Sequence, residues 1–132
     1  MRLASIRLIT DNVDRLVTFY EQVTGLRARR LTEQFAELVT PSGTLAIGST
    51  DTMALFTAGA AVPASNRTAI VEFQVDDVDA EYDRVAGYSP EIVQKPTTMP
   101  WGNRSLLFRD PDGNLINFFT PLTDEARARL TR

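Results

Sequence analysis

The stretch Pro41-Ser-Gly-Thr-Leu-Ala-Ile47 returns seventy residues later as Pro111-Asp-Gly-Asn-Leu-Ile-Asn117. A second pair precedes these two stretches in the same order. Ile6-Arg-Leu-Ile-Thr-Asp-Asn-Val-Asp14 resembles Val71-Glu-Phe-Gln-Val-Asp-Asp-Val-Asp79, which lies 65 residues further on. Internal repeats are the sequence signature of a structural unit used more than once. The chain is therefore predicted to contain one unit twice.

Each repeat predicts the same order of elements, βαβββ, from alternating and helical apolar periodicity. In the first repeat Asp11 or Asn12 caps the helix and Gly25 ends it, while Gly87 ends the helix of the second. A short, weakly held helix is expected over residues 124–130. The predicted strands cover residues 2–10, 26–31, 34–40 and 44–49, then 69–75, 91–95, 103–109 and 115–120; the predicted helices cover 13–24 and 77–86.

The predicted fold class is α+β, with two βαβββ modules forming a cupped, incomplete mixed-sheet barrel. One domain, residues 1–132, holds module one (2–56), a linker (57–67), module two (68–121) and a C-terminal tail (122–132). A four-stranded sheet covered by one helix leaves its other face open. Two such faces can surround a shared cleft, and concave, partly polar clefts are where small molecules bind.

The composition narrows the chemistry. The chain has no Cys, which excludes disulfides and thiolate catalysis, and no His, which removes the commonest metal ligand and general base. A net charge of −3 argues against a nucleic-acid surface. No signal peptide or membrane span is visible in the sequence. We therefore expect a cytoplasmic protein that binds neither nucleic acid nor membrane.

Several motifs carry a family resemblance. They are the paired units, the run Asp11-Asn-Val-Asp14 with Phe19-Tyr20 and Gly25 after it, the turn Pro100-Trp-Gly102 with Arg104, and the stretch Phe108-Arg-Asp-Pro-Asp-Gly-Asn114. With these features the chain resembles the vicinal oxygen chelate superfamily over residues 3–121. That superfamily includes glyoxalase I, extradiol dioxygenases, fosfomycin-resistance enzymes and bleomycin-binding resistance proteins. The resemblance implies the glyoxalase/bleomycin-resistance/dioxygenase fold.

The resemblance also implies where a metal would be held. Family enzymes carry His, Glu or Gln ligands on the first and last strand of each unit, and the shifts of 65 and 70 place these positions at Ser5, Ile70, Ile47 and Asn117. Two of the four side chains are aliphatic and two are weak neutral ligands, whereas divalent sites need charged oxygens or imidazoles. We expect neither a metal nor another cofactor.

Strand alternation predicts the lining of the cleft. Ser5, Arg7 and Ile9 are placed opposite their pseudo-symmetric counterparts in the second unit, and the last strand of each unit adds more. Strand by strand, the predicted lining is Ser5, Arg7, Ile9; Leu45, Ile47, Ser49; Ile70, Glu72, Gln74; and Leu115, Asn117, Phe119. The ligand-binding candidates are Ser5, Arg7, Ile47, Ile70, Glu72, Trp101, Arg104, Asn117 and Phe119.

Alternatives stay open for four of these candidates. Arg7 and Glu72 form either a structural ion pair or a ligand clamp, in which Arg7 meets a carboxylate or enolate and Glu72 an amine. Trp101 is either a rim residue or an aromatic wall. Arg104 either lies in the cleft or pairs with Asp110 or Asp112 outside it. Phe35 and Met53 are further apolar wall candidates, with core packing as the alternative.

Three functions follow from these residues. The first is a metal-independent small-molecule-binding protein, similar to bleomycin-type resistance proteins, that sequesters an antibiotic or planar metabolite. The second is a metal-free lyase or isomerase with Glu72 as general base. The third, a metal-dependent glyoxalase-like or dioxygenase-like enzyme, is opposed by the residues at the ligand positions. We expect binding without catalysis, and a homodimer.

Overall fold

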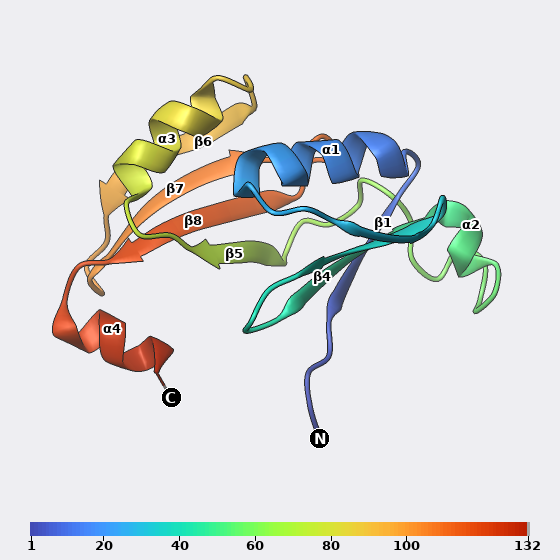
Figure 1. Ribbon diagram of the computed structural model, residues 1–132, viewed down its shortest axis with the longest axis horizontal. Helices are drawn as coiled ribbons and strands as arrows, with labels where there is room; N and C mark the ends of the chain where they lie inside the picture. The colour runs from blue at the N-terminus through green and yellow to red at the C-terminus, as the bar shows by residue number, and fades with distance from the viewer. Residues whose placement is uncertain (132) are drawn as a thin grey trace. The chain divides into compact units, whose positions relative to one another are not determined.

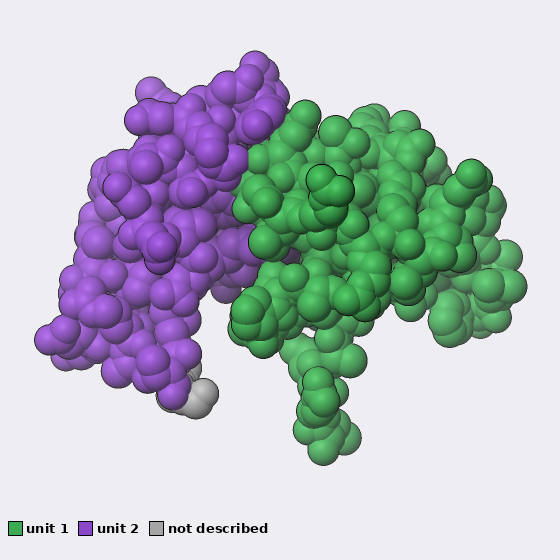
Figure 2. All heavy atoms as spheres, viewed as in Figure 1, with its two compact units in different colours: residues 1–66, 111–113 green, residues 67–110, 114–132 purple. Residues whose placement is uncertain are grey.

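The two repeats fold into two units with the same arrangement of elements. A computed structural model describes residues 1–131 (Figure 1). Unit 1 holds residues 1–66 and 111–113, and unit 2 holds residues 67–110 and the chain from 114 onward (Figure 2). Each unit contains a four-stranded mixed sheet with helices, so the α+β class is confirmed.

In both sheets the first strand of the unit runs parallel to the last, and the remaining neighbours are antiparallel. The strand orders are β1-β4-β3-β2 and β5-β8-β7-β6. The elements of unit 1 are β1 (Ile6–Thr10), α1 (Val13–Thr24), β2 (Arg29–Thr32), β3 (Phe35–Val39), β4 (Thr44–Ser49) and α2 (Thr50–Met53). Those of unit 2 are β5 (Ile70–Gln74), α3 (Val78–Ala86), β6 (Glu91–Thr98), β7 (Asn103–Arg109), β8 (Leu115–Pro121) and α4 (Asp124–Leu130).

Helix α1 forms as its sequence predicts. Asn12 is the N-cap, because its side chain accepts a hydrogen bond of 3.0 Å from the Arg15 amide. Gly25 ends the helix with a left-handed φ of 72°, which glycine adopts without steric cost. One stripe of the helix is buried: Val13, Leu16, Val17, Tyr20 and Val23. The stripe packs against β3 and β4.

The sheet of unit 1 has one face under α1 and one open face. Ala36, Leu38, Leu45 and Ile47 are each at most 7% exposed and form the covered face with Leu8. Because neighbouring side chains along a strand point to opposite faces, Arg7, Phe35, Glu37 and Ala46 lie on the other side. Short helix α2, which we did not predict, follows β4 directly (Figure 1).

The two repeats change register by one residue at the turn before their last strand. In unit 1 the Thr40 amide donates to the Gly43 carbonyl, whereas in unit 2 the Asp110 amide donates to the Asn114 carbonyl, one residue further along. The shift between the units is therefore 70 before this turn and 71 after it. Asn117, opposite Glu72, corresponds to Ala46, opposite Arg7, and not to Ile47.

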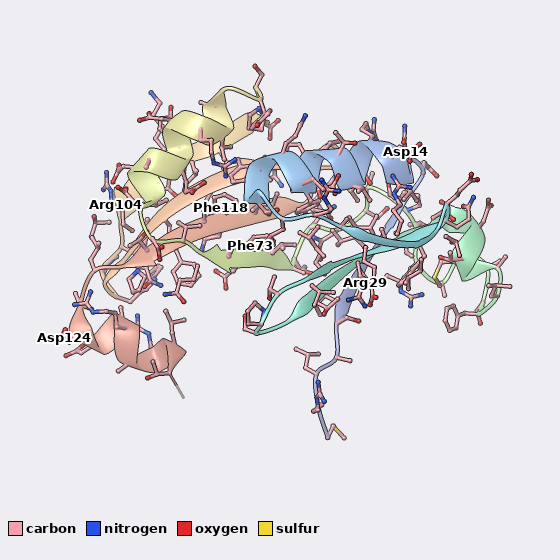
Figure 3. The ribbon with its side chains drawn as sticks, in the orientation of Figure 1. Asp14, Arg29, Phe73, Arg104, Phe118 and Asp124 are labelled. Atoms are coloured by element: carbon pink, nitrogen blue, oxygen red, sulfur yellow. The ribbon has the colours of Figure 1, made fainter. Side chains whose placement is uncertain are left out.

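In unit 2 an aromatic cluster fills the covered face. The Phe118 ring contacts Phe73 and Phe108 edge to face, at centroid distances of 5.7 and 5.0 Å. Figure 3 labels Phe73 and Phe118. Helix α3 contacts β6, β7 and β8 and is capped by the Asp77 side chain, which accepts from the amides of Asp79 and Ala80. Among residues 1–131, no helix is long and apolar enough to cross a membrane.

Candidate functional site

The open face of unit 2 brings four predicted site residues together. Ile70 and Glu72 on β5 share this face with Asn117 and Phe119 on β8, because each pair of register partners points to the same side of the sheet. Ile70 and Glu72 are exposed, while Asn117 and Phe119 are 9% and 8% exposed. These four side chains therefore combine one exposed carboxylate and one buried amide with apolar surface.

Glu72 and Asn117 form a directed polar pair. The Asn117 amide nitrogen donates a hydrogen bond of 2.8 Å to Glu72 Oε2. The Asn117 amide oxygen is buried and accepts no hydrogen bond from the described residues. The reversed amide orientation would set two acceptors against each other, so the contact with Glu72 fixes which way Asn117 points. Asn117 thus holds the Glu72 carboxylate in one orientation at the surface of β5.

On the open face of unit 1, Arg7 is held by aromatic rings. Its guanidinium carbon lies 4.7 Å from the ring centroid of Phe35 and 5.6 Å from that of Phe56. Phe35 therefore lies on this open face, beside Arg7. Phe56 was missed by the sequence analysis, because nothing in the residues after β4 indicates that the chain turns back toward β1. The predicted ion pair or ligand clamp of Arg7 with Glu72 involves residues of both units and stays a prediction.

One predicted site residue, Ile47, lies on the covered face of unit 1. The prediction that Ile47 lines the open face is wrong, because Ile47 pairs with Leu8 on the face under α1 and is 0% exposed. Leu45 and Ser49 point to the same side of β4 as Ile47, so their predicted place on the open face is wrong as well. Ser5 precedes β1 and is exposed, so the structure leaves its predicted role untested.

Arg104 belongs to a surface ion pair with α3. The guanidinium of Arg104, which is labelled in Figure 3, donates two hydrogen bonds to the Asp79 carboxylate, of 2.9 and 3.0 Å, and a third to Thr98. Neither predicted location, in the cleft or beside Asp110 or Asp112, is correct. Register places Arg104 opposite Thr120, on the α3 side of the sheet. The hydrogen bonds from Arg104 hold the pKa of Asp79 below its ordinary value, and the same bonds raise the pKa of Arg104.

Replacing Arg104 by Gln is therefore expected to raise the pKa of Asp79 toward its ordinary value. A carboxyl whose pKa is lowered by folding stabilises the protein above its unfolded pKa, near 4, and loses that effect as the pH falls through the folded pKa. Any stability difference between Arg104→Gln and wild type should thus shrink in acid. The measurement is an NMR pH titration of the Asp79 carboxyl carbon. Arg84→Gln, which removes a charge bound to Glu81 instead, should leave the Asp79 titration unchanged.

Trp101 lies in the turn between β6 and β7 and is 58% exposed. Its carbonyl accepts a hydrogen bond of 2.6 Å from Arg129. The neighbouring Gly102 has a φ of 94° and lies close to Thr123, the N-cap of α4. The turn thus anchors the C-terminal helix, and the predicted stacking of Trp101 on a ligand stays a proposal.

Comparison of the sequence with protein-family models gives one match that covers most of the chain. The family model for the Glyoxalase/Bleomycin resistance protein/Dioxygenase superfamily matches residues 2–118. The chain belongs to this superfamily. The match spans both repeats of the chain.

Individual proteins are similar to this chain over most of its length. A Bacillus subtilis (strain 168) protein, YraH, described as uncharacterized, is 29% identical over 128 residues, which cover 92% of this chain and 100% of YraH. A superfamily structure from Nocardioides has a TM-score of 0.75 at 25% identity, covering 94% of this chain and 85% of that one. A superfamily enzyme from Burkholderia phytofirmans PsJN, at 18% identity, shares the fold with a TM-score of 0.82 over 92% of this chain and 100% of that one.

The ligand positions implied by the superfamily resemblance do not fit a divalent metal. With the corrected register they are Ser5, Ala46, Ile70 and Asn117. None of these side chains is charged, and the methyl group of Ala46 offers no lone pair, as Ile47 offers none. Within residues 1–131, no three His, Cys, Asp or Glu side chains are grouped so that they could hold a metal ion. The Asn117 amide is instead directed at Glu72.

Proposed function

We propose that this superfamily member is a small-molecule-binding protein that works without a metal, with Glu72 as its polar handle. The observation that carries the proposal is the hydrogen bond of 2.8 Å from Asn117 to Glu72. Asn117 stands at a position where the superfamily resemblance implies a metal ligand. The uncharged amide there orients a neighbouring carboxylate, so the polar chemistry of this face lies in Glu72.

The surroundings of Glu72 favour an organic ligand with a hydrogen-bond donor. A carboxylate accepts hydrogen bonds, most strongly from ammonium or guanidinium groups. Ile70 and Phe119 on the same face, with Leu107 beside Asn117, supply apolar surface for the body of the ligand. An amine-bearing antibiotic or planar metabolite has both features. Sequestration of such a compound would need no further catalytic group.

The expected result for Glu72→Gln is a loss of affinity of about tenfold or more for an amine-bearing ligand, because a charge-assisted hydrogen bond contributes about 1.5–3 kcal/mol. The measurement begins with a thermal-shift screen of antibiotics and planar metabolites in buffer that contains a metal chelator. Calorimetry then gives the affinity of each compound that binds. Asp83→Asn, which removes an exposed charge on α3, is the matched control and should bind as wild type does. Affinity that requires added metal, or that Glu72→Gln leaves unchanged, would contradict the proposal.

The same contact favours one second candidate, a metal-free lyase or isomerase with Glu72 as general base. A base must be held within reach of the proton it removes, and Asn117 holds the exposed carboxylate in one orientation. Prolonged incubation of each binding compound with the protein, followed by mass spectrometry, separates the two functions. Unchanged compound supports binding alone, whereas product formation abolished in Glu72→Gln supports catalysis. The predicted homodimer concerns a second copy of the chain and stays a prediction.

A further inference from the structure

The open face of unit 1 contains a second arrangement of polar and aromatic groups, formed by Arg7, Phe35 and Phe56, which we name the Arg7 cradle. These residues come from β1, β3 and the segment after α2. Arg7 is exposed and makes no hydrogen bond or ion pair with the described residues of unit 1. Within unit 1 its guanidinium lies over the rings of Phe35 and Phe56. Ring contacts of this kind hold the planar guanidinium while leaving its N–H donors available.

Gly48 makes room for the cradle. A Cβ at this position would lie 3.0 Å from Thr52 Oγ1, 3.5 Å from Phe35 and 3.6 Å from the Arg7 Cδ. The side chains of Arg7 and Phe35 thus extend over the bare backbone of β4. The Thr52 hydroxyl donates a hydrogen bond of 2.6 Å to the Ser49 carbonyl, which ties α2 to the end of β4 next to the cradle.

The charges around the cradle indicate the charge of its ligand. Register places Arg7, Ala46, Glu37 and Arg29 in one row across the open face, from β1 to β2. Two positive groups and one negative group leave this row with a single net positive charge. Such a row suits a monoanion, because the Glu37 carboxylate opposes a second negative charge.

The shape of the cradle indicates the rest of the ligand. A carboxylate matches the bidentate N–H fork of a guanidinium. Phe56 is 69% exposed, so a flat ring attached to the carboxylate can cover apolar surface that now faces water. We propose that the Arg7 cradle binds an aromatic monocarboxylate. This inference goes beyond the proposed function, because it assigns a ligand to the open face of unit 1, whereas Glu72 belongs to unit 2.

The experiment titrates the chain with benzoate, benzamide and inorganic phosphate, followed by NMR chemical shifts. Saturable benzoate binding is expected, with benzamide and phosphate at least about tenfold weaker, since a charge-assisted pair contributes that much. Arg7→Gln should lose about tenfold or more, and Phe56→Ala should lose affinity as well. Arg27→Gln, which removes an exposed cation before β2 and outside the row, is the matched control and should lose at most about twofold.

Arg7→Lys separates recognition from folding, because it keeps the charge but loses the bidentate fork, and should fall between wild type and Arg7→Gln. Three results would overturn the inference: no saturable benzoate binding at millimolar concentration, phosphate binding as tight as benzoate, or benzoate affinity unchanged in Arg7→Gln. These results leave the proposed function standing if compounds from the screen still bind in a Glu72-dependent way. Loss of Glu72 dependence, with an intact benzoate site, would contradict the proposed function alone.

Discussion

Phe118→Ala is expected to cost the protein about 3–5 kcal/mol of its free energy of unfolding. Phe118 is 1% exposed and lies in the middle of the aromatic cluster of unit 2, between Phe73 and Phe108. Truncation to Ala removes the transfer energy of the ring, leaves a cavity and breaks two edge-to-face contacts. The loss is a large part of the 5–15 kcal/mol that typically stabilises a domain.

The measurement is urea unfolding of Phe118→Ala and wild type, followed by circular dichroism. Leu55→Ala is the control, because Leu55 is an apolar side chain that is 86% exposed and should change stability by at most about 0.5 kcal/mol. A loss below about 1 kcal/mol for Phe118→Ala would show that β8 does not direct this residue into the core. That result would also overturn the assignment of Asn117 to the open face.

Gly102→Ala is expected to release helix α4 from unit 2. A Cβ at this position would lie 2.3 Å from Thr123 Oγ1, far inside van der Waals contact. Thr123 Oγ1 accepts from the Ala126 amide and caps α4, and the Gly102 carbonyl accepts a hydrogen bond of 2.8 Å from Leu122. The φ of 94° adds backbone strain for any residue with a Cβ, of about 1–3 kcal/mol.

The measurement is amide hydrogen exchange over residues 122–131, which should speed up in Gly102→Ala. Gly59→Ala is a matched control, since Gly59 has a φ of 80° but its added Cβ would meet nothing within 4 Å. It carries the backbone strain without the clash at Thr123. Equal exchange of α4 in both variants would contradict the anchoring role of the turn.

The repeat predicts nearly every element of the fold, and it misassigns one register. Helix α1 follows from a cap, an apolar stripe and a stop, which are all local signals. The sheet face assigned to Ile47 depends on whether Gly43 is aligned with Gly113 or with Asn114. The identical residue, Gly113, is the natural match, but the hydrogen bonds of the two turns align Gly43 with Asn114. In unit 2 the Asp110 carboxylate accepts hydrogen bonds from both the backbone N–H and the side-chain nitrogen of Asn114. These two bonds accommodate the extra residue in the turn of unit 2. A slip of one residue moves a strand's side chains to the opposite face.

The partners of the charged residues were harder to predict, because they lie far apart in the chain. Arg104 and Asp79 are 25 residues apart and meet through the packing of α3 on β7. Phe56 reaches Arg7 through α2, a four-residue helix without a periodic pattern. By contrast, the open faces of β1, β5 and β8 follow from simple alternation, which correctly places Arg7, Glu72 and Asn117 on the faces away from the helices.

The side-chain amide of Asn117 offers the most direct test of metal-independent binding at Glu72. Its two N–H signals can be followed by NMR while a compound from the thermal-shift screen is added in the presence of a chelator. We predict saturable shifts of these signals in wild type, with the same midpoint as the calorimetric titration, and a midpoint at a ligand concentration about tenfold or more higher in Glu72→Gln. Shifts that appear only after a divalent metal is added, or binding that leaves both signals unmoved, would contradict the account.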